Sequence, residues 1–240
     1  VINGKKEVEA PQFGDNFRIF MNWVDEFRDM DVRTNADTPE DALRAREYGA
    51  QGIGLARTEH MFFGEERIRE MRRMIISESE EERRNALQNL LPYQREDFIE
   101  IFEAMEGLPV TVRLLDPPLH EFLPDEEKEV KTLAKELGIS TTELNRKIRL
   151  LNEFNPMLGH RGCRLGITYP EITEMQARAI LEAAVEVKSR GKEVYPEIMI
   201  PLVGTAEEFI HERHVVDEIA EDVFAEKSSE VNYKVGTMIE

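Results

Sequence analysis

The stretch GIGLARTEH, from Gly52 to His60, begins like the glycine motif of dinucleotide-binding sheets, G-x-G-x-x-G. The place of the third glycine is taken by Arg57, a bulky cation that prevents the close backbone packing this motif needs. The short apolar run before Arg57 instead predicts a buried strand that ends in a positive charge. The stretch thus argues against a dinucleotide site and raises the question of what Arg57 binds.

Strands and helices alternate along the chain on both sides of this run. Besides residues 52–57, the pattern predicts short strands at residues 32–37, 109–115, 161–166, 195–201 and 233–240. The first helix is expected at residues 38–49, with Thr38 as N-cap, Pro39 at the first position, Asp41 closing a capping box and Gly49 at the end. Further helical material includes residues 92–107.

Two helices are predicted in the second half of the chain. Residues 170–191 end at Gly191 and place five apolar residues on one helical face: Ile172, Met175, Ala179, Ala183 and Val187. Thr205 and Glu208 have the spacing of a capping box at the start of the next helix, which carries Val216, Ile219 and Val223.

Six strands alternating with helices imply a parallel sheet, as in a doubly wound fold or a (β/α)8 barrel. The strands end in charged residues and none carries a complete glycine fingerprint, which favours an α/β barrel truncated after about six strands. Residues 1–15 are polar and contain Gly4, Pro11 and Gly14, so they are expected to be a linker or the tail of a preceding domain, and residues 16–240 the partial barrel.

The composition limits the classes of partner. The chain has 240 residues, with 31 Lys and Arg against 49 Asp and Glu, and a net charge of −18, which disfavours nucleic acid. No apolar run is long enough to cross a membrane and no signal peptide precedes the first strand, so a cytoplasmic location is expected. The single cysteine, Cys163, cannot form an intramolecular disulfide and is interpreted as buried packing.

Arginines follow three of the predicted strands. Arg57, Arg113 and Arg161 lie at the ends of the second, third and fourth strands, where barrel enzymes build their sites. Guanidinium groups match phosphate and carboxylate oxygens, so the three are predicted to converge on one small anion. The competing interpretation is that each arginine pairs with a nearby carboxylate. The long segments after Arg57 and Arg113 favour function, and Asp116 is expected to orient Arg113.

Other polar residues carry weaker hypotheses. Glu240 could be a Mg²⁺ ligand, although such a site needs a second carboxylate. The histidines His211 and His214 are spaced one residue short of H-E-x-x-H, so a solvated helix face is expected rather than zinc. His60 and His160 lie beside Arg57 and Arg161 and could line the pocket or be structural.

Residues 133–151 have the pattern of a helix-turn-helix. The acidic sequence before them and the net charge of the chain argue against DNA binding. We expect this helical pair to pack over the barrel after the third strand.

Six blocks, VRTNADTPEDALRA, GIGLARTEHMFF, TVRLLDPPLHEFLP, NPMLGHRGCRLG, PEIMIPLVGTAEEF and VGTMIE, resemble the phosphoenolpyruvate-binding barrel of the pyruvate, phosphate dikinases. They run from residue 31 to residue 240 in the family's order. Phosphoenolpyruvate synthases and enzyme I of the sugar phosphotransferase system share the barrel and its arginines. The DPPLHEFLP block and the helical segment after it look like the dikinase variety.

The resemblance implies that Arg57 and Arg113 bind phosphoenolpyruvate or pyruvate, that Arg161 lies nearby, and that Glu240 is a Mg²⁺ ligand. In the family, a phosphohistidine on a swivelling domain donates its phosphoryl group to pyruvate, and ATP phosphorylates that histidine. The family usually has Cys where Ala56 stands, a difference we expect to be tolerated.

The family's second metal ligand, catalytic cysteine, phosphohistidine and ATP-binding domains are not in this sequence. The resemblance therefore implies a fragment that is inactive alone, with residues 1–15 as the tail of the phosphohistidine domain. A strand edge left open after the sixth strand favours a homodimer. A noncatalytic module that senses phosphoenolpyruvate or dimerises is the alternative.

Overall fold

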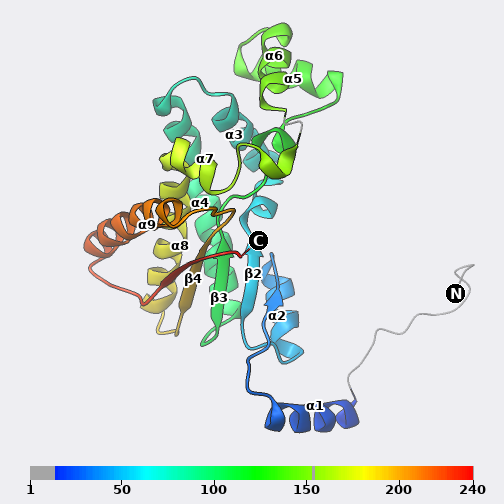
Figure 1. Ribbon diagram of the computed structural model, residues 1–240, viewed down its shortest axis with the longest axis vertical. Coiled ribbons are helices and arrows are strands. Elements are labelled where there is room, and N and C mark those ends of the chain that lie inside the picture. Colours follow the sequence, from blue (N-terminus) through cyan, green and yellow to red (C-terminus); the bar gives the residue numbers. More distant parts are fainter. Residues whose placement is uncertain (1–13, 153–154, 240) are drawn as a thin grey trace, which may run out of the picture. The chain divides into compact units, whose positions relative to one another are not determined.

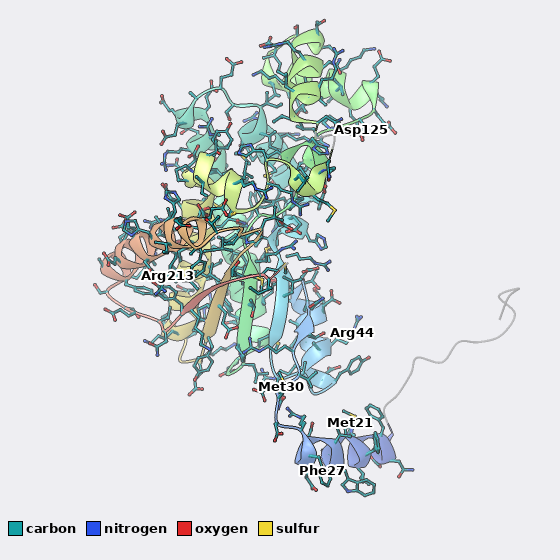
Figure 2. The ribbon with its side chains drawn as sticks, in the orientation of Figure 1. Met21, Phe27, Met30, Arg44, Asp125 and Arg213 are labelled. Carbon is teal, nitrogen blue, oxygen red and sulfur yellow. The ribbon has the colours of Figure 1, made fainter. Side chains whose placement is uncertain are left out.

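The computed structural model describes residues 14–152 and 155–239, and the chain divides into two compact units after Val32. The first unit contains helix α1 (Asp15–Phe27), of which no residue is buried. Its large apolar side chains are exposed, including Phe27 at 85% (Figure 2). The predicted division of the chain at residue 15 stays a prediction. None of the helices in the described ranges is long and apolar enough to cross a bilayer.

The second unit is built on a parallel sheet, which has five strands in the described part of the chain (Figure 1). The strands are β1 (Thr34–Asn35), β2 (Ile53–Arg57), β3 (Pro109–Arg113), β4 (Tyr195–Ile200) and β5 (Lys234–Thr237). They neighbour one another in chain order, β1-β2-β3-β4-β5, and each pair is parallel. The alternating pattern thus correctly predicted a parallel α/β sheet, which is open within these residues.

The predicted strand at residues 161–166 is wrong. This segment forms a turn at Gly162 followed by the short helix α7 (Cys163–Thr168), and β3 pairs directly with β4. The backbone N–H groups of Gly162 and Cys163 donate to the carbonyls of Asp116 and Pro201, at 3.2 and 3.0 Å. The segment therefore bridges the residues that follow β3 and β4 and does not join the ladder.

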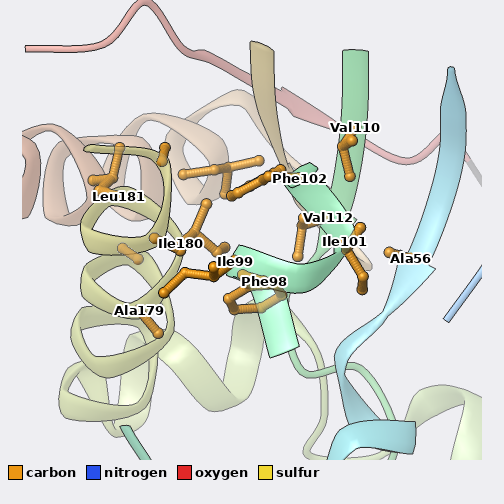
Figure 3. Close-up of a cluster of buried hydrophobic side chains, with 14 of the residues drawn as sticks. Ala56, Phe98, Ile99, Ile101, Phe102, Val110, Val112, Ala179, Ile180 and Leu181 are labelled. Carbon is orange, nitrogen blue, oxygen red and sulfur yellow. The ribbon is translucent and has the colours of Figure 1, made fainter. Parts of the chain in front are cut away.

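Three long helices cover one face of the sheet: α4 (Glu80–Ala104), α8 (Pro170–Ser189) and α9 (Ala206–Lys227). Figure 3 shows Phe98 and Phe102 of α4 between Val112 of β3 and Ile180 of α8. All four side chains are at most 1% exposed. This layer holds the strands in place, so their carboxyl ends form a fixed edge.

The long segments after β2 and β3 are helical. They contribute the 3₁₀ turns η1 (Thr58–Phe62), η2 (Leu119–Phe122) and η3 (Pro156–Leu158), and the helices α3 (Glu65–Ile76), α5 (Glu127–Leu137) and α6 (Thr141–Leu151). A second apolar core joins them, with Phe62, Phe122 and Leu144 among its members. The helix-turn-helix shape predicted at residues 133–151 is present as α5 and α6, with Gly138 between them at φ 69°. It packs into this second core, and its expected position over a barrel stays a prediction.

The predicted starts of three helices, α2, α8 and α9, agree with the structure. Helix α2 (Pro39–Glu47) begins after Thr38, whose hydroxyl accepts from the Asp41 N–H at 3.1 Å. Thr205 and Glu208 form a complete capping box at the start of α9, and the five predicted apolar residues of α8 are buried. Helix α4 extends further toward the N-terminus than residue 92, and Pro92 lies inside it.

Candidate anion-binding site

The ends of β2 and β3 place two of the predicted arginines side by side. Arg57 is the last residue of β2 and Arg113 the last of β3, and their Cα atoms are paired in the parallel register. Adjacent strands of a sheet lie about 4.8 Å apart, so the two side chains start from neighbouring points on one edge. The sequence therefore correctly placed Arg57 and Arg113 at the same end of the sheet.

Asp116 joins Arg113 to Arg161. Its Oδ2 lies 3.0 Å from Nη1 of Arg113 and 2.7 Å from Nη2 of Arg161, and its backbone carbonyl accepts from Nε of Arg161 at 3.0 Å. The carboxylate is almost fully buried. Because a charge-assisted bond fixes both partners, Asp116 holds two guanidinium groups in one arrangement. Asp116 thus contacts Arg113 as expected and Arg161 as well.

Arg57 is held by a different carboxylate, Asp37. The Asp37 side chain accepts from Nη2 and Nε of Arg57 at 2.5 and 3.0 Å, and from its backbone N–H at 2.8 Å. Nδ1 of His60 lies 2.9 Å from the same Oδ2 atom. Burial alone would raise the pKa of Asp37, but the hydrogen bonds from Arg57 outweigh it and lower that pKa. Asp37 therefore stays ionised and fixes Arg57.

Glu59 is a third carboxylate at this edge, in η1 two residues after Arg57. Its Oε1 accepts from Nη2 of Arg113, and its side chain is 10% exposed. Four atoms in this region are buried without a hydrogen-bond partner in the described part of the chain: Thr58 Oγ1, Glu59 Oε2, Arg113 Nε and Asp116 Oδ1. Buried polar atoms are normally paired, so four exceptions at one end of the sheet set this region apart from the rest of the described core.

The turn at Gly162 sets the position of Arg161. Gly162 has φ 57°, and a Cβ atom there would lie 2.7 Å from Cβ of Leu202 and 3.4 Å from Oδ1 of Asp116. Leu202 itself has φ 61°, an uncommon value for a residue other than glycine. The Cys163 thiol donates a hydrogen bond to the Leu202 backbone carbonyl, with 3.1 Å between sulfur and oxygen. The loop after β4 and the Arg161 turn are thus packed tightly together.

The three guanidinium groups are matched by three carboxylates: Asp37, Glu59 and Asp116. The alternative that each arginine pairs with a nearby carboxylate is therefore confirmed, and binding of one small anion by the three arginines stays a prediction. The two interpretations are compatible, since Arg carries five N–H donors and a carboxylate partner uses only some of them. Asp37 and Glu59 were missed from the sequence, although Asp37 ends the predicted strand 32–37 and Glu59 lies two residues after the predicted strand 52–57.

The remaining candidates lie apart from these contacts or outside the described residues. Burial raises the pKa of Cys163 to about 11, so its thiol is unreactive at neutral pH, as expected for packing. His214 is exposed, and its Nε2 lies 3.3 Å from Oε1 of Glu218 on the same helix. His160 Nε2 lies 2.9 Å from the Thr168 hydroxyl. Glu240 lies outside the described residues.

A parallel α/β sheet with arginines gathered at its carboxyl edge defines a domain suited to a small phosphorylated or carboxylate ligand. The chain belongs to the family described as PEP-utilising enzyme, PEP-binding domain, which matches residues 13–240.

Several curated relatives are similar over the whole chain. It is 57% identical to pyruvate, phosphate dikinase 1, chloroplastic, of Arabidopsis thaliana, covering 25% of that protein. It is 53% identical to pyruvate, phosphate dikinase of Clostridium symbiosum and 54% identical to pyruvate, phosphate dikinase 2 of Zea mays, covering 28% of each. The chain thus spans about a quarter of the length of these relatives.

Proposed function

We propose that this chain is the phosphoenolpyruvate- and pyruvate-binding part of a pyruvate, phosphate dikinase. Such an enzyme converts ATP, phosphate and pyruvate to AMP, diphosphate and phosphoenolpyruvate by way of a phosphohistidine. The observation that carries the proposal is the pairing of Arg57 with Arg113 at one sheet edge, with Arg161 joined through Asp116. Relatives at 53–57% identity named as dikinases favour this over the synthase-like and enzyme I-like alternatives.

The proposed role of the arginines follows from the negative charges of the ligand and of the transferring phosphoryl group. Phosphoenolpyruvate carries a phosphate and a carboxylate, and both match guanidinium donors. During transfer, negative charge spreads over the phosphoryl oxygens and the enolate oxygen of pyruvate. Arginines already held by Asp37, Glu59 and Asp116 need little reorganisation to meet that charge, which is the condition for electrostatic catalysis.

The proposed architecture is a (β/α)8 barrel, of which this chain supplies the first strands. The strand order supports this, because all five described strands neighbour one another in chain order without the reversal of a doubly wound sheet. The helices α4, α8 and α9 on one face leave the other face for the barrel interior (Figure 1). Glu197 of β4 on that face accepts from Thr111 of β3 and Arg33, at 2.8 and 2.5 Å.

A Mg²⁺ ion remains part of the proposal only through the resemblance. Within residues 14–152 and 155–239, no group of three or more His, Cys, Asp or Glu side chains is arranged to hold a metal. The described residues therefore do not fit a complete metal site. A phosphohistidine domain of the full-length protein and a second copy of the chain are the proposed partners.

The experiment separates the two half-reactions in a full-length protein that carries this chain. Arg57→Ala is expected to lower phosphoryl transfer to pyruvate by about 100-fold or more, as for removal of one preorganised donor. ATP-dependent phosphorylation of the histidine should be unchanged. The control is Arg44→Ala on α2, whose side chain is 62% exposed (Figure 2). Equal loss of both half-reactions in Arg57→Ala contradicts the assignment.

A further inference from the structure

Glu59 makes a contact that crosses from one strand end to the next. It follows β2 by two residues, and its Oε1 accepts from Nη2 of Arg113 at the end of β3. The two side chains are only 10% and 12% exposed. A buried carboxylate is costly unless it is paired, so this ion pair must form as the domain folds.

Arg113 is held at two nitrogens by two carboxylates. Oε1 of Glu59 accepts a hydrogen bond from Nη2 of Arg113, and Oδ2 of Asp116 lies 3.0 Å from Nη1. With both terminal nitrogens fixed and the Cα atom anchored in the β2–β3 ladder, the guanidinium plane has one orientation. Asp116 alone leaves the group free to pivot about the Nη1 contact. Glu59 thus supplies the second fixed point.

We infer that Glu59 is a positioning residue for Arg113, which sets the orientation of this guanidinium during phosphoryl transfer. The inference rests on the proposed function, since it assigns Arg113 to the transferring phosphoryl group. Glu59 itself carries a negative charge and does not bind the anionic substrate. We therefore expect the loss of Glu59 to slow the chemical step and not to weaken substrate binding. Small displacements of a donor have large effects on the rate of that step.

The test variant is Glu59→Gln in a full-length protein that carries this chain. Glutamine keeps the size of the side chain and one acceptor oxygen but removes the charge, so it holds Arg113 more weakly. The kcat of phosphoryl transfer to pyruvate is expected to fall about 10- to 100-fold. The KM for pyruvate should not rise, because loss of a negative charge beside the site favours anion binding. ATP-dependent histidine phosphorylation should be unchanged.

Glu171→Gln is the matched control. Glu171 of α8 is 3% exposed and pairs with Arg83 of α4 at 2.5 Å, so this variant removes an equally buried charge from the helical layer. It should lose stability without loss of kcat. If Glu59→Gln does not fold, Glu59→Asp carries the test, since it keeps the charge and shifts the carboxylate by one methylene. It should lower kcat at unchanged KM.

Two results separate failure of this inference from failure of the proposed function. A wild-type protein that cannot transfer a phosphoryl group to pyruvate overturns both. A wild type that is active, with a folded Glu59→Gln or Glu59→Asp variant of unchanged kcat, overturns the positioning role alone. An increase in KM without loss of kcat also overturns it, because that is the signature of ground-state binding.

Discussion

Replacing Gly162 with alanine should destabilise the domain through two separate effects. Positive φ costs a residue with a Cβ atom about 1–2 kcal/mol, and Gly162 has φ 57°. The added Cβ would also lie 2.7 Å from Cβ of Leu202, well inside ordinary carbon contact. Such overpacking costs about 1–3 kcal/mol. The expected loss for Gly162→Ala is therefore about 2–5 kcal/mol.

Gly191 provides the control for the backbone effect. It also has a positive φ, 82°, but a Cβ atom there has no neighbour within 4 Å. Gly191→Ala should thus lose only about 1–2 kcal/mol. Urea unfolding of the 240-residue chain, followed by circular dichroism, measures both variants.

The difference between the two variants reports the contact at the Arg161 turn. A gap of about 1–3 kcal/mol is expected. Equal losses, within about 0.5 kcal/mol, would refute the tight packing of the Arg161 turn against Leu202 and Asp116.

Three further predictions concern Glu212, Cys163 and strand β5. Burial raises the pKa of the Glu212 carboxyl, so the folded state favours its protonated form. The free energy of unfolding therefore falls as the pH rises from the ordinary pKa of glutamate through the raised pKa of the folded state. Glu212→Gln should therefore flatten the pH dependence of the urea midpoint above about pH 4.3, and an unchanged pH profile contradicts this. Cys163 is 1% exposed, so a maleimide at neutral pH should label it only after unfolding in urea; rapid labelling of the native chain argues against its burial. The outer edge of β5 (Lys234–Thr237) has no strand partner in the described residues, so light scattering should detect a dimer of the 240-residue chain; a monomer at high concentration removes the proposed homodimer.

Much of the site could be predicted because it depends on local patterns. Short apolar runs that end in Arg57 and Arg113 identify two strands and their carboxyl ends. In a parallel sheet those ends share one edge, so the pairing of the two arginines follows from the topology. The helix caps at Thr38 and Thr205 were equally local, since a side chain bonds a backbone group three residues later.

The error at residues 161–166 has a long-range cause. An apolar and polar alternation in six residues does not distinguish a strand from a short helix. Two backbone hydrogen bonds decide the conformation. They run from the N–H groups of Gly162 and Cys163 to the carbonyls of Asp116 and Pro201, which are distant in sequence. These acceptors become available only when β3 and β4 are already neighbours.

The start of α4 and the carboxylates of the site could have been identified from the sequence. Ser79 caps α4 by accepting from the Glu82 N–H at 3.2 Å, and three glutamates follow it, as is typical of a helix start. The helical material predicted at residues 92–107 covers the second part of this helix, with Pro92 inside it. Asp37 and Glu59 each lie two residues after a strand end and could have been included with the arginines by the same rule.

The central claim, that the arginines at the carboxyl edge bind phosphoenolpyruvate, is tested most directly by calorimetric titration. Phosphoenolpyruvate would be added to a full-length protein that carries this chain, and to its Arg57→Ala, Arg113→Ala and Arg44→Ala variants. Loss of a charge-assisted contact, worth about 1.5–3 kcal/mol, should raise Kd about 10-fold or more in the first two variants and not in the third. Wild-type affinity in folded Arg57→Ala and Arg113→Ala proteins would contradict the claim.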